Sequence, residues 1–176
     1  MDRYTSDLDI YISEYNLFRQ DRRQHNRGDG LVDVYIKDIF KASHIEQPSS
    51  VSEHNFQQLW LKVQCKKFKS FLLCTVYRPP DSPIIFLEHL SKTPIDLLLP
   101  GLKVIILGDL NCNMIETSTD GRALAEFCST FNLTQLVNEP TRVTETLQTS
   151  IDAALTTNVN IVYACEVKSS TIIAII

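Results

Sequence analysis

The chain has 176 residues, of which 44% are hydrophobic and 22% charged, and its formal net charge at pH 7 is -4. This length and composition support one sizeable hydrophobic core, so we expect a single domain over residues 1–176. A small negative charge excludes a uniformly basic surface of the kind that is typical of nucleic-acid binding. No apolar run reaches the roughly 18 residues that a membrane span needs.

The five cysteines include no C-x-x-C pair, and their odd number is untypical of a disulfide framework or a zinc site. We therefore expect buried thiols in a reducing compartment. The sequence opens without a charged-then-apolar leader. These features predict an intracellular protein, in the nucleus or the cytoplasm, that is not secreted.

The first half of the chain predicts strands joined by polar connections. The strongest strand patterns, which alternate or are rich in β-branched and aromatic residues, cover residues 31–36, 58–65 and 71–77. Residues 14–19 alternate more weakly. The polar residues 42–55 predict a loop, and residues 66–70 predict a hairpin connection.

Tyr77 is expected at the end of a strand, because the two prolines that follow Arg78 cannot supply hydrogen bonds to a ladder. Ser82 and Pro83 then suit an N-cap and a first helical position. Phe86, Leu87 and Leu90 continue at helical spacing, which predicts a short helix that Pro94 breaks or kinks.

The apolar run from Lys103 stops at Gly108 and is followed by Asp109 and Asn111. Such a run predicts a strand buried on both faces, with Asp109 and Asn111 at its carboxyl end. Their side chains should project to the same side, about 6 to 7 Å apart at the Cα atoms. Strand ends of layered α/β proteins are where ligands bind, so this pair is the first candidate site.

After this strand, Asp120 is expected to cap a helix that buries Leu124, Phe127, Cys128 and Phe131 on one face. Short strands follow at residues 150–155 and 161–165, with a turn at residues 139–142 between the helix and the first of them. Strands interleaved with only two helices predict stacked sheets flanked by helices, in the α/β class.

Several motifs occur together in a characteristic order. They are Tyr15-Asn-Leu-Phe-Arg-Gln-Asp-Arg22, Gly28-Asp-Gly-Leu-Val-Asp-Val-Tyr-Ile-Lys37, Val76-Tyr-Arg-Pro-Pro80, Gly108-Asp-Leu-Asn111, Gln135-Leu-Val-Asn-Glu-Pro-Thr-Arg142 and Ser150-Ile-Asp152. Each motif is short, but the ordered set resembles the endonuclease domain of non-LTR retrotransposons. That domain is a branch of the endonuclease/exonuclease/phosphatase family, and the resemblance covers about residues 15–152.

The resemblance implies a four-layer α/β sandwich and a Mg²⁺-dependent hydrolase that cuts phosphodiester bonds of DNA. It also implies site residues. Asp109 would accept a proton from the attacking water, Asn111 would hold the water or a phosphate oxygen, and Tyr77 would point its hydroxyl at the phosphate. Arg78 and Thr141 would contact the DNA backbone. In the family, the acid that matches Asp152 orients a catalytic histidine.

The chain departs from the family pattern at both ends. The Ser-Asp-His motif of the family has no counterpart in residues 167–176, and alignment by eye places the metal-binding Glu of the family just ahead of Met1. The resemblance therefore implies a partial domain that lacks strands at both ends and has impaired catalysis, with its metal ligands unknown. Asp7, Asp9 and Glu14 are the candidate substitutes for the missing carboxylate.

Alternatives stay open at each level. The chain could be an inactive remnant of the same fold that binds DNA or a protein, or a product without settled activity, whose uncharged tail at residues 172–176 resembles aggregation-prone windows. Asp109 could merely cap a turn, Tyr77 could be a core tyrosine, and Asp152 could be a buried turn acid. The sequence determines neither the DNA target nor the oligomeric state.

Overall fold

The computed structural model describes most of the chain, and the account below concerns the described residues. They are residues 11–20, 32–46, 49–52, 55–66, 69–80, 82–84, 86–91, 101–115, 118–145, 148–168 and 171–175.

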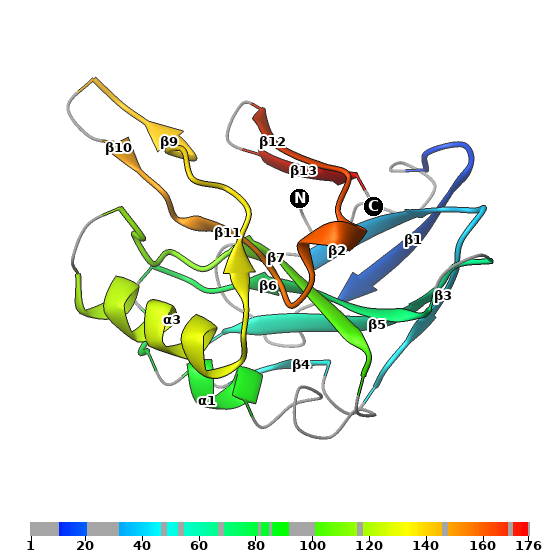
Figure 1. Cartoon of the computed structure of the whole chain (residues 1–176), viewed down its shortest axis with the longest axis horizontal. Coiled ribbons are helices and arrows are strands. Elements are labelled where there is room, and N and C mark those ends of the chain that lie inside the picture. The colour runs from blue at the N-terminus through cyan, green and yellow to red at the C-terminus, as the bar shows by residue number, and fades with distance from the viewer. Residues whose placement is uncertain are drawn as a thin grey trace.

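A seven-stranded sheet with the strand order β3-β5-β6-β7-β11-β8 forms the centre of the molecule, and β4 pairs with β5 beside this path (Figure 1). Its strands are β3 (Lys41–His44), β4 (Ser50–Val51), β5 (Gln57–Gln64), β6 (Phe71–Tyr77), β7 (Lys103–Asp109), β8 (Thr134–Gln135) and β11 (Asp152–Thr156). The β6–β7 pair is parallel, whereas β7 and β11 are antiparallel.

Three two-stranded sheets and a few helices accompany the central sheet. The two-stranded sheets are β1 (Tyr15–Gln20) with β2 (Val32–Lys37), β9 (Arg142–Val143) with β10 (Gln148–Thr149), and β12 (Ala164–Lys168) with β13 (Thr171–Ile175). The helices are α1 (Phe86–Ser91), α3 (Thr119–Thr130) and the 3₁₀ turn η1 (Val159–Ile161). The β9–β10 hairpin stands out from the body of the molecule (Figure 1).

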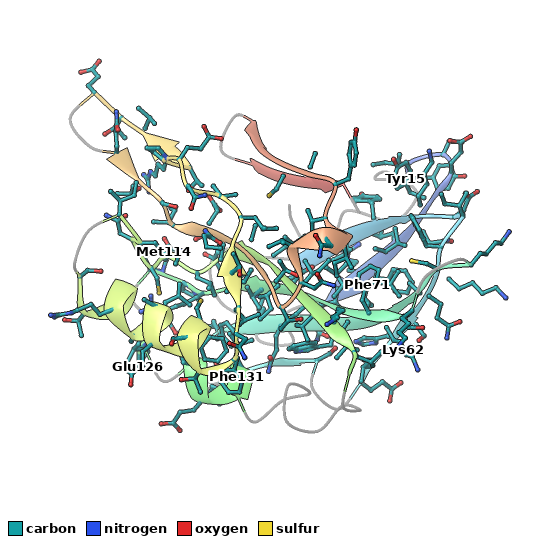
Figure 2. The ribbon with its side chains drawn as sticks, viewed as in Figure 1. Tyr15, Lys62, Phe71, Met114, Glu126 and Phe131 are labelled. Atoms are coloured by element: carbon teal, nitrogen blue, oxygen red, sulfur yellow. The ribbon has the colours of Figure 1, made fainter. Side chains whose placement is uncertain are left out.

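The central sheet is covered on both faces by apolar side chains. On one face, Leu124 and Phe127 of α3 and Leu90 of α1 pack against a cluster that contains Trp60 and Ile106. On the other face, residues of the β1–β2 hairpin pack against a second cluster, which contains Leu61, Phe71, Leu73 and Ile105. Phe131 and Phe71, both labelled in Figure 2, lie on these two opposite sides. Burial on both faces explains why the central strands read as nearly continuous apolar runs.

The structure confirms the α/β class and most of the expected strands. The described residues form three layers, namely helices, the central sheet and the β1–β2 sheet, so the expected four-layer arrangement is not confirmed. Trp60 is fully buried, and all five cysteines are free thiols. None of the helices in the described ranges has the length and apolar character that a membrane crossing requires.

Some expected elements were wrong. Residues 42–55, expected as a loop, contain the short strands β3 and β4, whose polar side chains hide the strand pattern. Helix α3 begins two residues earlier than expected, because Ser118 and not Asp120 is the N-cap. The Ser118 hydroxyl accepts from the N–H of Gly121 at 3.0 Å. Residues 161–165, expected as one strand, are divided between η1 and the start of β12. Pro94 lies outside the described residues.

Gly108 stands where β7 passes very close to the neighbouring strand. Its φ is +143°, and a Cβ built on it would lie 1.9 Å from the carbonyl oxygen of Val76 in β6. Only a residue without a side chain fits this approach, since both the backbone conformation and the neighbouring carbonyl reject a Cβ. Gly108 therefore fixes the spacing of β6 and β7 immediately before Asp109.

We expect Gly108→Ala to destabilise the fold by about 3 kcal/mol or more, because strained backbone and a clash with a sheet carbonyl are among the severe mechanisms of destabilisation. Gly101→Ala is the matched control. Gly101 also has a positive φ, +104°, but a Cβ there meets nothing within 4 Å, so this change should cost only about 1 to 2 kcal/mol. Urea unfolding of the two variants measures the difference, and equal midpoints would contradict this account of Gly108.

Candidate functional site

A row of polar side chains crosses one face of the central sheet at the carboxyl ends of β6 and β7. Tyr77 is the register partner of Asp109 in the parallel pair, and Asp109 is the register partner of Asp152 in the antiparallel pair. Gln57 of β5 continues the row, opposite Tyr77. Register partners on adjacent strands share a face and have Cα atoms about 4.5 to 5.5 Å apart in antiparallel pairs. The structure thus brings Tyr77, Asp109 and Asp152 together.

The row borders the apolar face that the β1–β2 hairpin covers. Tyr77 is half-buried and packs against the cluster that contains Phe71 and Leu73. The alternative that Tyr77 is a core tyrosine is therefore observed in part, because the ring of Tyr77 packs against the core. Tyr77, Asp109 and Asp152 are partly exposed, whereas Gln57 at the end of the row is fully buried.

Backbone hydrogen bonds extend the strand pairing beyond the strands themselves. The N–H of Arg78 donates to the carbonyl of Asp109 at 2.8 Å, and the N–H of Leu110 donates to the carbonyl of Ile151 at 3.1 Å. The N–H of Met114, labelled in Figure 2 in the loop between β7 and α3, donates to the carbonyl of Ser150 at 3.0 Å. The loop after β7 is thereby fixed to the segment that leads into β11.

Asp109 and Asn111 form a tight turn at the end of β7. The N–H of Asn111 donates to Oδ1 of Asp109 at 2.9 Å, and its Nδ2 donates to the carbonyl oxygen of Arg78 at 2.7 Å. Asn111 has a φ of +48°, in the left-handed region that asparagine tolerates better than most residues. The turn-capping alternative for Asp109 is thus observed, and it coexists with a place in the polar row.

Thr141 holds the start of β11. It is buried, and its Oγ1 accepts from the N–H groups of Ile151 and Asp152 at 3.1 and 3.2 Å. Its hydroxyl also hydrogen-bonds the carboxylate of Asp152, which lowers the pKa of that acid. This environment differs from the DNA contact expected of Thr141, because its hydroxyl hydrogen-bonds two backbone N–H groups and the Asp152 carboxylate inside the protein.

Arg78 also differs from its expected DNA contact. The residue is 2% exposed, and its three guanidinium nitrogens all donate to acceptors within the protein. Nε donates to the carbonyl of Ser82, Nη1 to the carbonyl of Leu110, and Nη2 to Oδ2 of Asp120. A sequence motif cannot reveal this, because an arginine at a strand exit looks the same whether it faces solvent or a loop.

The two carboxylates of the row disfavour each other's ionised state. Burial raises the pKa of Asp109, and the nearby Asp152 carboxylate raises it further, while hydrogen bonds from Asn111 and the charge of Arg142 act in the opposite direction. Burial also raises the pKa of Asp152. Since the folded protein binds these protons more tightly than the unfolded chain, their contribution to stability is present at low pH and is lost as the pH rises through the folded-state pKa values.

Two further residues of the site were not identified from the sequence. Asp120 reaches Arg78 from the first turn of α3, and Asn113 accepts from the N–H of Ser150 at 3.1 Å through its Oδ1. The spacing between these partners, 42 and 37 positions, is far too long for a local pattern to show. Of the four histidines of the chain, His44 is exposed and His89 stacks on Phe56, while His25 and His54 lie outside the described residues.

The donor set for a metal ion is incomplete in what the structure describes. Within the described ranges, no three Asp, Glu, His or Cys side chains gather closely enough to hold a metal ion. Of the candidate substitutes, Glu14 lies in the turn before β1, whereas Asp7 and Asp9 lie outside the described residues.

Comparison with known proteins gives a consistent pattern. A family model described as endonuclease–reverse transcriptase matches residues 71–173. No curated protein matches the sequence. Among solved structures, the endonuclease domain of TRAS1, a telomere-specific non-LTR retrotransposon, superposes with a TM-score of 0.70 at 16% identity, covering 92% of this chain and 76% of that one.

Two structures from Bacteroides thetaiotaomicron are also similar. An endonuclease/exonuclease/phosphatase family protein has a TM-score of 0.57 at 15% identity. The match covers 96% of this chain and 71% of the chain of that protein. A mannosyl-6-phosphatase has a TM-score of 0.58 at 16% identity, and the match covers 96% of this chain and 74% of the phosphatase chain. At these identities the likeness concerns the fold, which the neighbours use for more than one substrate.

The neighbours of Asp109 should shift its pKa in opposite directions. Asp152→Asn removes the like charge and should lower the pKa of Asp109, whereas Arg142→Gln removes a favourable charge and should raise it. A ¹³C NMR titration of the carboxyl carbons measures both changes. Shifts of the same sign in the two variants would show that these charges do not reach Asp109 as the structure implies.

Thr141→Val should leave two buried N–H groups without their acceptor and cost about 1 to 3 kcal/mol of folding stability. It should also raise the pKa of Asp152, because the hydrogen bond that lowers it is lost. Thr141→Ser keeps the hydroxyl and is the matched control. Chemical unfolding and the same NMR titration test the pair of variants, and a neutral Thr141→Val would contradict the assigned contacts.

Proposed function

Because the chain belongs to the endonuclease–reverse transcriptase family, we propose that its polar row binds the DNA backbone and hydrolyses a phosphodiester bond. The observation that carries this proposal is the common register of Tyr77, Asp109 and Asp152 on one sheet face, with Asn111 in the adjoining turn. In-line attack on a phosphate mainly requires that a water be aimed and that charge on the phosphate oxygens be stabilised. The row offers both kinds of group.

We assign the base role to Asp109. Burial and the neighbouring carboxylate raise its pKa, which makes its ionised form a stronger proton acceptor than an aspartate in water. Asn111 uses its Nδ2 on the carbonyl of Arg78, so its amide oxygen is the atom that accepts a hydrogen bond from the water. The Tyr77 hydroxyl donates to a phosphate oxygen, and Thr141 keeps Asp152 in place.

The family is generally metal-dependent, and its resemblance to this chain implies Mg²⁺. The described residues do not form a donor set of three, so no step of this mechanism passes through a metal ion. The assay below contains Mg²⁺ only because the family is generally metal-dependent.

A second candidate is DNA binding with little or no cleavage. The printed sequence contains no histidine after His89, whereas family members place one after the acid that matches Asp152. Removing a participant in proton transfer or charge stabilisation typically costs about 10²- to 10⁴-fold in rate. We therefore propose that hydrolysis by residues 1–176, assayed by themselves, is slow.

Nicking of supercoiled plasmid in the presence of Mg²⁺ tests both candidates. Asp109→Ala should lower the nicking rate by about 10²-fold or more, since it removes the base. Glu126→Ala is the control, because Glu126 is an exposed carboxylate on α3 (Figure 2) and its loss should leave the rate unchanged. Equal nicking by the protein and by Asp109→Ala would overturn the assignment of the base.

Two further arms separate the candidates. If the absent imidazole limits the rate, free imidazole should accelerate nicking by the protein and not by Asp109→Ala. Retention of DNA that weakens steeply with salt, without nicking in any condition, would favour the binding function.

A further inference from the structure

We propose that Asp120 and Arg78 act as a positioning pair for Asn111, so that the first turn of α3 sets the geometry of the turn at the end of β7. This inference deepens the proposed function and rests on it for its catalytic meaning. It assigns to Arg78 a role different from DNA contact, and to Asp120 a role that no motif suggests.

Arg78 contacts the turn after β7 with its side chain. Nη1 donates to the carbonyls of Leu110 and Asn111 at 3.2 and 3.3 Å, and to Sγ of Cys112 at 3.3 Å. These acceptors belong to consecutive residues, so one end of a rigid, planar group holds the whole turn. The orientation of the guanidinium therefore contributes to the position of the turn, beside the backbone hydrogen bonds that tie the loop to the segment before β11.

The backbone of the same residue contacts the turn from the other side. The N–H of Arg78 donates to the carbonyl of Asp109, and its carbonyl accepts from Nδ2 of Asn111 at 2.7 Å. The Asn111 side chain is thus held by Arg78 directly, while its carbonyl is held by the guanidinium. The side-chain amide and the carbonyl of Asn111 therefore share Arg78 as a common partner.

Asp120 is the anionic partner that orients this buried cation. Its Oδ2 lies 2.6 Å from Nη2 of Arg78, and the Arg78 side chain is 3% exposed whereas that of Asp120 is 37% exposed. Other acceptors that the guanidinium contacts within the described ranges are backbone carbonyls and the Cys112 thiol, whose pKa burial raises to about 11. A buried guanidinium that loses its charged partner reorients towards solvent or another acceptor.

Asn111 is the residue that we expect a reorientation of the Arg78 guanidinium to affect most. Its φ of +48° is a conformation that a few specific contacts must maintain. The Arg78 guanidinium supplies one of those contacts, from Nη1 to the Asn111 carbonyl, and Asp120 orients that guanidinium from a helix distant in sequence. Loss of the Asp120–Arg78 pair is expected to release the amide group that we propose to aim the attacking water.

The competing explanation is that Asp120 only stabilises α3. It lies in the first turn of the helix, where a negative charge interacts favourably with the helix dipole. Thr119 is exposed and precedes it in the same turn. The double variant Thr119→Asp/Asp120→Ala restores the charge of the first turn without restoring the contact with Arg78, and it therefore separates the two roles.

The test compares the protein, Asp120→Ala and the double variant by NMR of the Asn111 side-chain amide, assigned by its absence in Asn111→Asp. We expect both variants to shift this resonance. They should also accelerate hydrogen exchange of the Asn111 side-chain amide by about 10-fold, because opening its hydrogen bond exposes the amide to solvent. Thermal melts should show that the double variant regains stability that Asp120→Ala lost. An unmoved Asn111 resonance, or one that the double variant restores, would overturn the inference.

Kinetics add a readout that a purely structural role would not move. Where the protein nicks plasmid, both variants should lower kcat by about 10-fold or more and leave KM nearly unchanged, because misplacing a water-aiming group affects the reacting geometry and not the binding of DNA. Absence of nicking in the unaltered protein would contradict the proposed function, while the NMR result would still decide whether the pair positions Asn111.

Discussion

The hydrogen-bonded register of β6, β7 and β11 is the constraint on which the site depends. Tyr77, Asp109 and Asp152 come from segments far apart in the chain, and they share one sheet face only because these strands pair in one particular alignment. A shift of a single residue in either pairing would turn one side chain to the opposite face. The absence of a side chain at Gly108 permits this alignment, because a Cβ there would collide with the carbonyl of Val76.

The register places two carboxylates side by side in a half-buried setting, which costs stability. Like charges directly opposite on neighbouring strands repel, and burial disfavours the ionised form of each. The apolar clusters on both faces of the central sheet oppose this cost. Such an arrangement is typical of a functional site, since it keeps a carboxylate ready to accept a proton at the expense of local stability.

The site also shows why the fold alone does not give the function. Its structural neighbours include an endonuclease domain and a mannosyl-6-phosphatase, and both superpose on the same central sheet at low identity. What distinguishes one activity from another must therefore lie in the side chains at the strand ends and in the loops that hold them. In this chain the loop after β7 is held by side-chain and backbone contacts to Arg78, so buried charge as well as backbone pairing contributes to its geometry.

The sequence by itself determined the long strands and pointed to Tyr77, Asp109 and Asp152 as candidate site residues. The apolar run that ends at Gly108, the strand at residues 71–77 and the periodic face of α3 were readable because hydrophobic burial leaves a local pattern. Short polar strands such as β3 left no such pattern. Only the tertiary structure decided that Arg78 and Thr141 face inward and that Asp120 and Asn113 complete the site, because these contacts join residues distant in sequence, and no local rule of propensity or spacing encodes the partner of a buried polar group.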